Sequence, residues 1–262
     1  MKTFQDSGRP VASGLLCLTI ALLLLAGCRK APDDRVQGYV EGEFVYVSSP
    51  LAGTVEKLAV QRGQQVAAAA PLFALDGTME LAARDQAQAA LVLSEAEYKR
   101  QEMLVKMGPS AVQEFDRARA ARDQDRQRLT QSEWNLAQMK QDAPQAGLVY
   151  DTLFRQGEWV APGKPIVALL PPANIKVRAF VPETRIGALQ VGEKARVAVD
   201  GVAETFDGTI SYISPRAEYT PPVIYSRESR SKLVFMVEIY FAPAVAAKLH
   251  PGQPVDVRFL GE

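Results

Sequence analysis

The chain contains 262 residues, of which 47% are hydrophobic and 23% are charged, and its 30 basic side chains balance its 30 acidic ones. This length suffices for one or two domains with real cores. The balanced charge argues against nucleic-acid binding, which needs a strongly basic surface. Two cysteines and the single His250 offer almost nothing for a His/Cys metal site or a Ser/His or Cys/His catalytic set. Composition therefore favours a protein that is not an enzyme and needs no metal or cofactor.

The N-terminal segment has the pattern of a secretion signal. Residues 11–25 are nearly all apolar or small and follow a short region that contains basic residues. The segment ends in Leu25-Ala26-Gly27-Cys28, which resembles the cleavage box of bacterial lipoproteins, where the cysteine becomes the lipidated first residue. We therefore expect residues 1–27 to be a lipoprotein signal peptide, Cys28 to be the lipid anchor and residues 28–36 to be a linker. The alternative is an uncleaved N-terminal membrane span; both interpretations anchor the chain to a membrane and export the rest.

One half-domain occurs twice in the chain. Residues 50–75 align with residues 144–169 without a gap, at a constant offset of 94 positions (144 minus 50), and ten of the 26 positions are identical. Glycine and proline recur where turns are expected, with short apolar runs between them, which predicts short strands in each copy. Such a half would be marginal alone, so we expect the segments 49–76 and 143–172 to pack as two halves of one sandwich. The turn glycines are Gly53, Gly63, Gly147, Gly157 and Gly163.

The intervening residues 77–142 are expected to be helical. Glycine and proline are missing from Thr78 to Asp142 except at Gly108-Pro109, and Ala, Gln, Glu, Arg and Leu, all good helix formers, dominate. Each arm has about 30 residues and so a length of roughly 45 Å. Apolar residues at a 3–4 spacing, interrupted by Arg122 and Asp125, predict an antiparallel two-helix coiled coil with a partly polar seam. Thr78 is expected to cap the first helix. An out-and-back hairpin returns to its start, so the two sandwich halves can meet.

Strand patterns return in the C-terminal third, residues 173–262. Residues 175–181 alternate apolar and polar side chains, as a half-buried strand does. The pattern around Val191-Gly192 recurs around Pro251-Gly252, and further strand candidates lie between them. Together with one N-terminal strand over residues 37–48, these segments suffice for a small antiparallel barrel with a membrane-proximal region.

The order of these parts resembles the HlyD-like family of periplasmic adaptors, also called membrane fusion proteins. The matching segments are residues 38–42, 49–55, 181–183, 217–222 and 227–235, and the last two resemble a subgroup that accompanies ABC exporters. The resemblance implies an elongated α+β fold. Its parts are a split lipoyl-like β-sandwich, interrupted by an antiparallel α-helical coiled-coil hairpin, and a C-terminal antiparallel β-barrel domain.

The resemblance also implies a function without bond chemistry. Such adaptors form rings, commonly hexameric, that join an inner-membrane transporter, here of the ABC type, to a TolC-like outer-membrane channel. The protein is then expected in the periplasm of a Gram-negative cell, attached to the membrane, most simply the inner one, through its N-terminal lipid. Neither a cofactor nor a nucleic-acid partner is implied.

The family pattern at the hairpin tip is an Arg, a Leu four residues later and a Ser seven residues further. Arg100 and Leu104 fit it, but the third position is Ala111, with Ser110 one residue early. The resemblance therefore implies a channel-docking tip at Arg100, Leu104, Gly108 and Ser110, with ordinary coiled-coil surface and seam as the alternative. Met103 and Met107 are expected to pack as apolar residues.

A second departure is Ala69, which aligns with Gly163, where the family usually has glycine in both copies. Because a residue other than glycine avoids positive φ, we expect the turn at Ala69 to differ in shape.

Two other functions compete with the adaptor. A structural coiled-coil lipoprotein would share the anchor and the helices, but it would not explain the split sandwich or the barrel. A biotinyl or lipoyl carrier needs a lysine on a tight hairpin between the halves, and Asp76-Gly77-Thr78 has none; Lys140, which follows Met139, is expected near the end of the helix.

Overall fold

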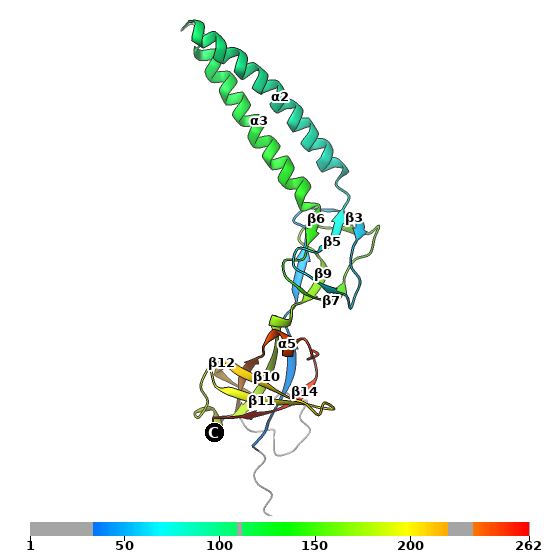
Figure 1. Ribbon diagram of the computed structural model, residues 1–262, viewed down its shortest axis with the longest axis vertical. Coiled ribbons are helices and arrows are strands. Elements are labelled where there is room, and N and C mark those ends of the chain that lie inside the picture. Colours follow the sequence, from blue (N-terminus) through cyan, green and yellow to red (C-terminus); the bar gives the residue numbers. More distant parts are fainter. Residues whose placement is uncertain (1–33, 109–111, 220–232, 262) are drawn as a thin grey trace, which may run out of the picture.

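The computed structural model describes residues 34–108, 112–219 and 233–261 as an elongated molecule with three parts in a row (Figure 1). A helical hairpin lies at one end, a β-sandwich in the middle and a β-barrel at the other end. The expected signal peptide and Cys28 lie outside the described residues. The strands and helices are β1 (Val36–Gly42), β2 (Val45–Ser48), β3 (Gly53–Leu58), β4 (Gln65–Val66), β5 (Pro71–Leu75), α2 (Thr78–Met107), α3 (Val112–Gln138), β6 (Lys140–Asp142), β7 (Gly147–Thr152), β8 (Trp159–Val160), β9 (Pro165–Leu170), the 3-10 turn η2 (Pro172–Asn174), β10 (Ile175–Pro182), α4 (Glu183–Ile186), β11 (Lys194–Val199), β12 (Thr205–Tyr219), β13 (Leu233–Tyr240), α5 (Pro243–Ala246) and β14 (Pro254–Phe259).

The antiparallel barrel is confirmed, and it closes through the first strand of the described chain. The strand order is β1-β10-β13-β12-β11-β14, so β1 lies between β10 and β14. Val40 is paired with Val177, and Val36 with Val257. Every second side chain of these strands points inward, as strand geometry requires, and the interior is filled by buried aliphatic side chains such as Val177, Val197 and Val237.

The segment 37–48, expected as one strand of the barrel region, is divided between two bodies. Strand β1 belongs to the barrel, whereas β2 pairs with β9 in the sandwich. The division falls where the chain leaves the barrel in a narrow passage. A Cβ atom at Gly42 would lie 2.8 Å from side-chain carbons of both Leu170 and Pro251. We call Glu43–Phe44, the two residues between β1 and β2, the connector.

The sandwich consists of two four-stranded sheets that interleave the two sequence repeats. One sheet has the order β2-β9-β7-β4 and the other β6-β5-β3-β8. Adding the offset of 94 to β3, β4 and β5 gives β7, β8 and β9, so each sheet contains strands from both repeats. The core between the sheets is apolar and includes Leu72, Val149, Ile166 and Leu169, all of which are fully buried.

The contacts between the two repeats are reciprocal. Gly53 is paired with Val160, and its counterpart Gly147 with Val66. The Gly63 N–H donates to the Val149 carbonyl over 2.8 Å. The equivalent bond, from the Gly157 N–H to the Val55 carbonyl, is also 2.8 Å. Such mutual exchange is what a twofold axis produces, so the sandwich has an internal approximate twofold axis relating its repeats.

Strand β6 lies in a segment that was expected to be helical. Helix α3 ends at Gln138, and Lys140–Asp142 pair with β5 in the sandwich. The offset of 94 explains the difference, because residues 140–142 of β6 are equivalent in the repeat to residues 46–48 of β2. The structural repeat therefore begins before Pro50 and Pro144, where the sequence identity begins.

The expected change of shape at Ala69 is wrong. Ala69 has φ = 60°, close to the 72° of Gly163. Both turns also make the same hydrogen bond. The Ala69 N–H donates to the Ala143 carbonyl and the Gly163 N–H donates to the Ser49 carbonyl, each over 2.8 Å. The pairing between the repeats thus holds an alanine in a backbone region that usually requires glycine.

Replacing Ala69 by glycine is therefore expected to stabilise the protein. The substitution removes the αL strain but raises the entropy of the unfolded chain, so we expect a net gain of up to about 1 kcal/mol in the free energy of unfolding. Chemical denaturation of the purified protein measures it, and Gly163→Ala, the reverse change in the other repeat, should destabilise. A loss of stability in Ala69→Gly would show that this turn is not strained.

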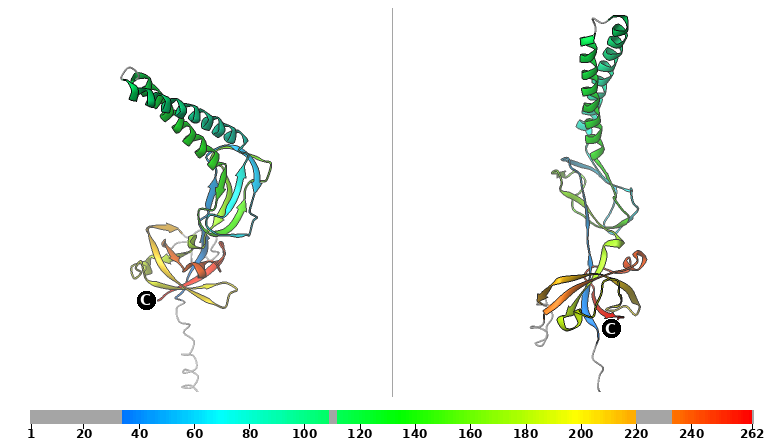
Figure 2. Two further views of the ribbon diagram at one scale, coloured as in Figure 1. Left: turned by 45° about the horizontal axis from the view of Figure 1, so that its top comes forward. Right: turned by 90° about the vertical axis from the view of Figure 1, so that its left-hand side faces the viewer.

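Helices α2 and α3 run side by side away from the sandwich in both views of Figure 2. Their buried apolar core consists of Ala87, Leu91 and Leu129. At the base of the hairpin, residues of the helices and of the sandwich line an open cleft of about 550 Å³, with Leu136 and Lys140 among them. The hairpin is thus a thin rod, and its base is joined to the sandwich by hydrogen bonds from the Leu75 N–H to the Met139 carbonyl (2.7 Å) and from the Ser49 hydroxyl to the Gln138 carbonyl (3.0 Å).

Thr78 does not cap α2 as expected. The N-cap is Gly77, which has no side chain to bind the free N–H groups of the first turn. Asp76 instead accepts hydrogen bonds from the Thr78 hydroxyl (2.5 Å) and the Thr78 N–H (3.0 Å). These two bonds, the side-chain one first, lower the pKa of Asp76.

Candidate docking site at the hairpin tip

The free end of the hairpin exposes a cluster of apolar side chains. We call Met103, Leu104, Met107 and Val112 the apolar tip. Met107, the last residue of α2, is 83% exposed, and Met103 and Val112 are about half exposed. Single exposed apolar residues are common on protein surfaces, whereas a group of them in one place is typical of a site that contacts a partner.

The expectation that Met103 and Met107 pack inside the hairpin is wrong. The half-buried seam residues near the tip are Tyr98, Gln101 and Val105. Both methionines lie outside this spacing, on the solvent side of α2. Continuing the 3–4 spacing from Leu91 through Tyr98 to Val105 would have identified them as exposed.

Of the other predicted tip residues, Arg100 lies on α2 outside the seam. The Arg100 guanidinium is exposed and lies 2.7 Å from a carboxylate oxygen of Glu97, one turn earlier. An exposed pair of this kind contributes little to stability, so Arg100 can exchange Glu97 for a partner. Gly108 follows the helix in an extended conformation (φ 176°), and no atom lies within 4 Å of the position of a Cβ. Ser110 and Ala111 lie outside the described residues.

Below the tip, the seam is closed by aromatic and cationic groups. The Tyr98 and Phe115 rings lie with their centroids 5.3 Å apart, and the Arg122 guanidinium carbon lies 4.0 Å from the Tyr98 centroid. Arg122 also donates to Asp123 over 2.6 Å. These contacts, the Asp123 hydrogen bond first, outweigh desolvation and raise the pKa of Arg122. A cation–π contact thus bridges the two helices where a leucine would be expected in an apolar coiled coil.

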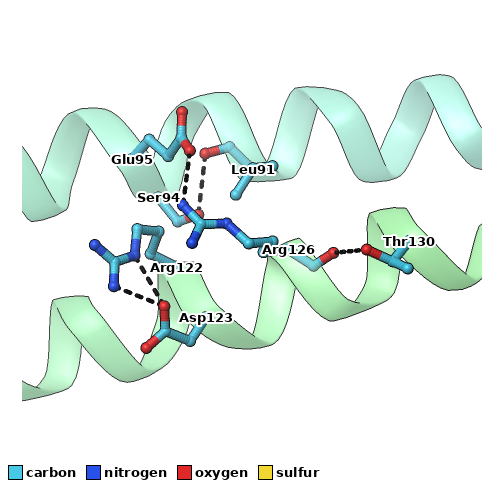
Figure 3. A network of polar contacts seen from close by, with 7 residues as sticks. All are labelled: Leu91, Ser94, Glu95, Arg122, Asp123, Arg126 and Thr130. Atoms are coloured by element: carbon cyan, nitrogen blue, oxygen red, sulfur yellow. Dashed lines mark hydrogen bonds and ion pairs between the residues drawn. The ribbon is translucent and has the colours of Figure 1, made fainter.

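Figure 3 shows a second polar bridge one turn further from the tip. Arg126 of α3 reaches Glu95 of α2, with 3.4 Å between Nη2 and Oε1. The Ser94 hydroxyl donates to the Leu91 carbonyl over 3.1 Å. The aromatic and cation–π contacts of Tyr98, Phe115 and Arg122 thus join the two helices near the tip, and the exposed Arg126–Glu95 pair adds one further contact between them.

The glycines predicted for the sandwich turns lie far from the tip and shape the sandwich. Gly63, Gly157 and Gly163 have φ between 72° and 89°, as their turns require. Gly53 and Gly147 are the first residues of β3 and β7. A Cβ at Gly147 would lie 3.0 Å from the Leu170 carbonyl oxygen, so this position needs glycine for close strand packing.

Lys140 does not have the position of a carrier lysine. It begins β6, where it is paired with Ala74, and the preceding Met139 is buried. A swinging-arm lysine would need a hairpin turn, so the geometry does not favour a biotinyl or lipoyl carrier.

Among the residues that the structure describes, none of the helices combines the length and the apolar character that crossing a bilayer demands.

No model of a protein family matches the chain. In sequence it is similar to the UPF0194 membrane protein in the asrC 5′ region of Acidithiobacillus ferridurans, with 32% identity over 66% of this chain. That match spans 52% of the relative, so the chain covers only about half its length. It is also 28% identical to the UPF0194 membrane protein YbhG of Salmonella arizonae, over 97% of this chain and 98% of that protein. This alignment has 326 positions, more than the 262 residues of the chain, so YbhG has segments that this chain lacks.

Two solved structures share the fold. The membrane fusion protein Spr0693 of Streptococcus pneumoniae superposes with a TM-score of 0.67 at 17% identity, over 87% of this chain and 99% of that one. A MacA–MexA chimera containing the Pseudomonas aeruginosa MexA α-hairpin domain gives 0.70 at 21% identity, over 87% and 80%. The chain is therefore similar in sequence to UPF0194 membrane proteins along nearly its whole length, and its fold is that of the membrane fusion proteins.

Proposed function

We propose that this protein is a periplasmic adaptor, which joins an inner-membrane transporter to an outer-membrane channel in an export complex. The observation that carries the proposal is the apolar tip, exposed at the end of the hairpin opposite the barrel (Figure 1). The resemblance to HlyD-like adaptors and the shared fold with membrane fusion proteins support it.

The geometry suits a mechanical role without bond chemistry. In this proposal the barrel contacts the transporter, which would be of the ABC type because residues 217–222 and 227–235 resemble that subgroup of adaptors. Copies of the sandwich, side by side in a ring, most simply a hexamer, would seal a passage. The hairpin, about 45 Å long at 1.5 Å per residue, would carry the apolar tip to a TolC-like channel.

Site-specific photo-crosslinking in cells tests this proposal. A photoreactive residue at Met107 is expected to form an adduct with an outer-membrane channel protein, because the tip side chain enters the contact. The same residue at Met79, equally exposed at the other end of α2, should form none. A crosslink pattern identical at both positions, without any channel adduct, would favour a structural coiled-coil lipoprotein instead.

We also propose that Cys28 carries the lipid anchor. Replacing it by alanine is expected to release the exported chain from the membrane or to leave it unprocessed, because each buried acyl CH₂ contributes about 0.8 kcal/mol to membrane binding. Cell fractionation and intact-mass spectrometry measure both effects. Cys17→Ala, within the predicted signal peptide, is the matched control and should be processed normally. A Cys28→Ala chain that stays membrane-bound at the wild-type mass would instead support an uncleaved N-terminal span.

A further inference from the structure

The chain passes twice between barrel and sandwich, and the two passages are tied to each other. The connector Glu43–Phe44 leads from β1 to β2, and η2 (Pro172–Asn174) leads from β9 to β10. The Glu43 N–H donates to the Asn174 carbonyl over 3.0 Å, and the Asn174 side-chain amide donates to the Glu43 carbonyl over 2.9 Å. The two passages therefore form one short double-stranded neck.

Lys176 lies next to this neck on the outer wall of the barrel. Its neighbours Ile175 and Val177 point into the barrel core, so strand alternation directs Lys176 outward. It is nevertheless only 3% exposed. Its Nζ lies 2.5 Å from Oε1 of Glu43 in the connector and 2.7 Å from Oε1 of Glu238 in β13. One ammonium group thus binds a carboxylate of the neck and a carboxylate of the barrel wall.

The carboxylates around Lys176 outnumber the cations, so their balance of charge depends on its ammonium group. Arg178 Nε lies 2.7 Å from Glu41 Oε2 and 3.5 Å from Glu238 Oε1. The cluster therefore has two cations for three carboxylates. Burial alone would lower the pKa of Lys176, but the hydrogen bonds to Glu238 and Glu43 outweigh it and raise the pKa, so the amine is charged at neutral pH. Removing the ammonium would leave Arg178 beside Glu41 and Glu238 and would take away the cation that holds Glu43, so release of Glu43, the most exposed of the three carboxylates, is favoured.

Apolar packing supports the neck from the inside. Leu170, the last residue of β9, belongs to the barrel core, and Phe44 and Leu148 pack against this core. The connector thus has backbone, apolar and ionic contacts with the second passage and the barrel.

We propose that Lys176 is a positioning residue that latches the connector to the barrel wall and thereby holds barrel and sandwich in one fixed relative orientation. This inference goes beyond the proposed function and does not rest on it, since it concerns the shape of the single chain.

Distance measurements between paired spin labels test the latch. Labels are placed on cysteines introduced at Lys57 in the sandwich and Arg258 in the barrel, both exposed strand residues, in the full-length chain with Cys17 and Cys28 changed to serine. A single narrow distance distribution is expected without further change. Lys176→Met, which keeps the buried stem but removes the charge, should cause loss of that narrow distribution. Glu43→Ala, which changes an exposed side chain outside the barrel, should do the same. Lys176→Arg, which keeps the positive charge, should retain the narrow distribution.

The controls separate the latch from the stability of the barrel. Lys248→Met and Glu204→Ala break an exposed ion pair of 3.3 Å elsewhere on the barrel and should leave the distribution narrow. A second label pair at Gln190 and Arg258, both on the barrel, should stay narrow in every variant. An unchanged Lys57–Arg258 distribution in Lys176→Met and Glu43→Ala would overturn the proposal. It would also be overturned if the barrel pair broadened in parallel, because Lys176 would then serve only barrel folding.

Discussion

Replacing Met107 by aspartate is expected to abolish export while leaving the protein folded and attached to the membrane. The side chain is exposed in the free chain, so the change costs little stability. In the proposed contact with a channel, however, the carboxylate would have to leave water without a partner, at a cost of several kcal/mol. Since 1.4 kcal/mol corresponds to a tenfold change in affinity, we expect docking to weaken at least about 100-fold. Leu104→Asp should behave in the same way, and so should Gly108→Asp, whose extended backbone accepts any residue.

The measurement is export of the cargo in cells, with protein level and membrane fractionation recorded in parallel. Met79→Asp is the matched control, because Met79 is 77% exposed on the same helix but lies roughly 42 Å from Met107 at 1.5 Å per residue. Export should be unaffected by that change. Normal export in Met107→Asp and Leu104→Asp would remove the apolar tip from the proposed function.

The largest effect on stability is expected from Gly38→Ala in the middle of β1. A Cβ there would lie 2.3 Å from the Arg178 carbonyl oxygen and 3.0 Å from the Ala179 Cα. Both are backbone atoms, so no rotamer change relieves the overlap and β1 must move away from β10. We expect the free energy of unfolding to fall by about 3 kcal/mol, the upper part of the range for overpacked sites.

Urea denaturation followed by circular dichroism measures this loss. Gly187→Ala serves as the control, because Gly187 has right-handed helical backbone angles and free space around it; it should be neutral or slightly stabilising. Equal stability of Gly38→Ala and the unmodified protein would show that β1 is not held against β10 as described.

The parts of the fold that sequence could predict are those encoded locally. The repeat at an offset of 94 preserves turn glycines and apolar positions, and both are visible without knowledge of which strands pair. The interleaving of the repeats is not encoded locally, because β4 joins the strands of the other repeat through pairing partners more than 80 positions away. For the same reason β2 and β6, short strands at the ends of the repeats, were assigned to neighbouring segments.

The candidate site shows a similar division. The seam spacing of α2 implies which residues face solvent, so the exposure of Met107 was available from the sequence. The burial of Lys176 was not, because alternation correctly directs it away from the barrel core and only the connector, folded back from β1, covers it. Ala69 shows a third case: its backbone angle is fixed by a hydrogen bond to Ala143, which no local preference of alanine reveals.

The pairing scheme also has a consequence for the order in which the chain can fold as it emerges during synthesis. Strand β3 pairs with β5 and β5 pairs with β6, but neither sheet is complete until strands of the second repeat have followed the helices, and the barrel closes only when β14 pairs with β1. Strand β1 therefore waits more than 130 residues for β10 and more than 200 residues for β14, a long interval in which its open edges invite association with other chains. A truncation after the hairpin would accordingly leave both sheets of the sandwich incomplete, and we expect it to be degraded.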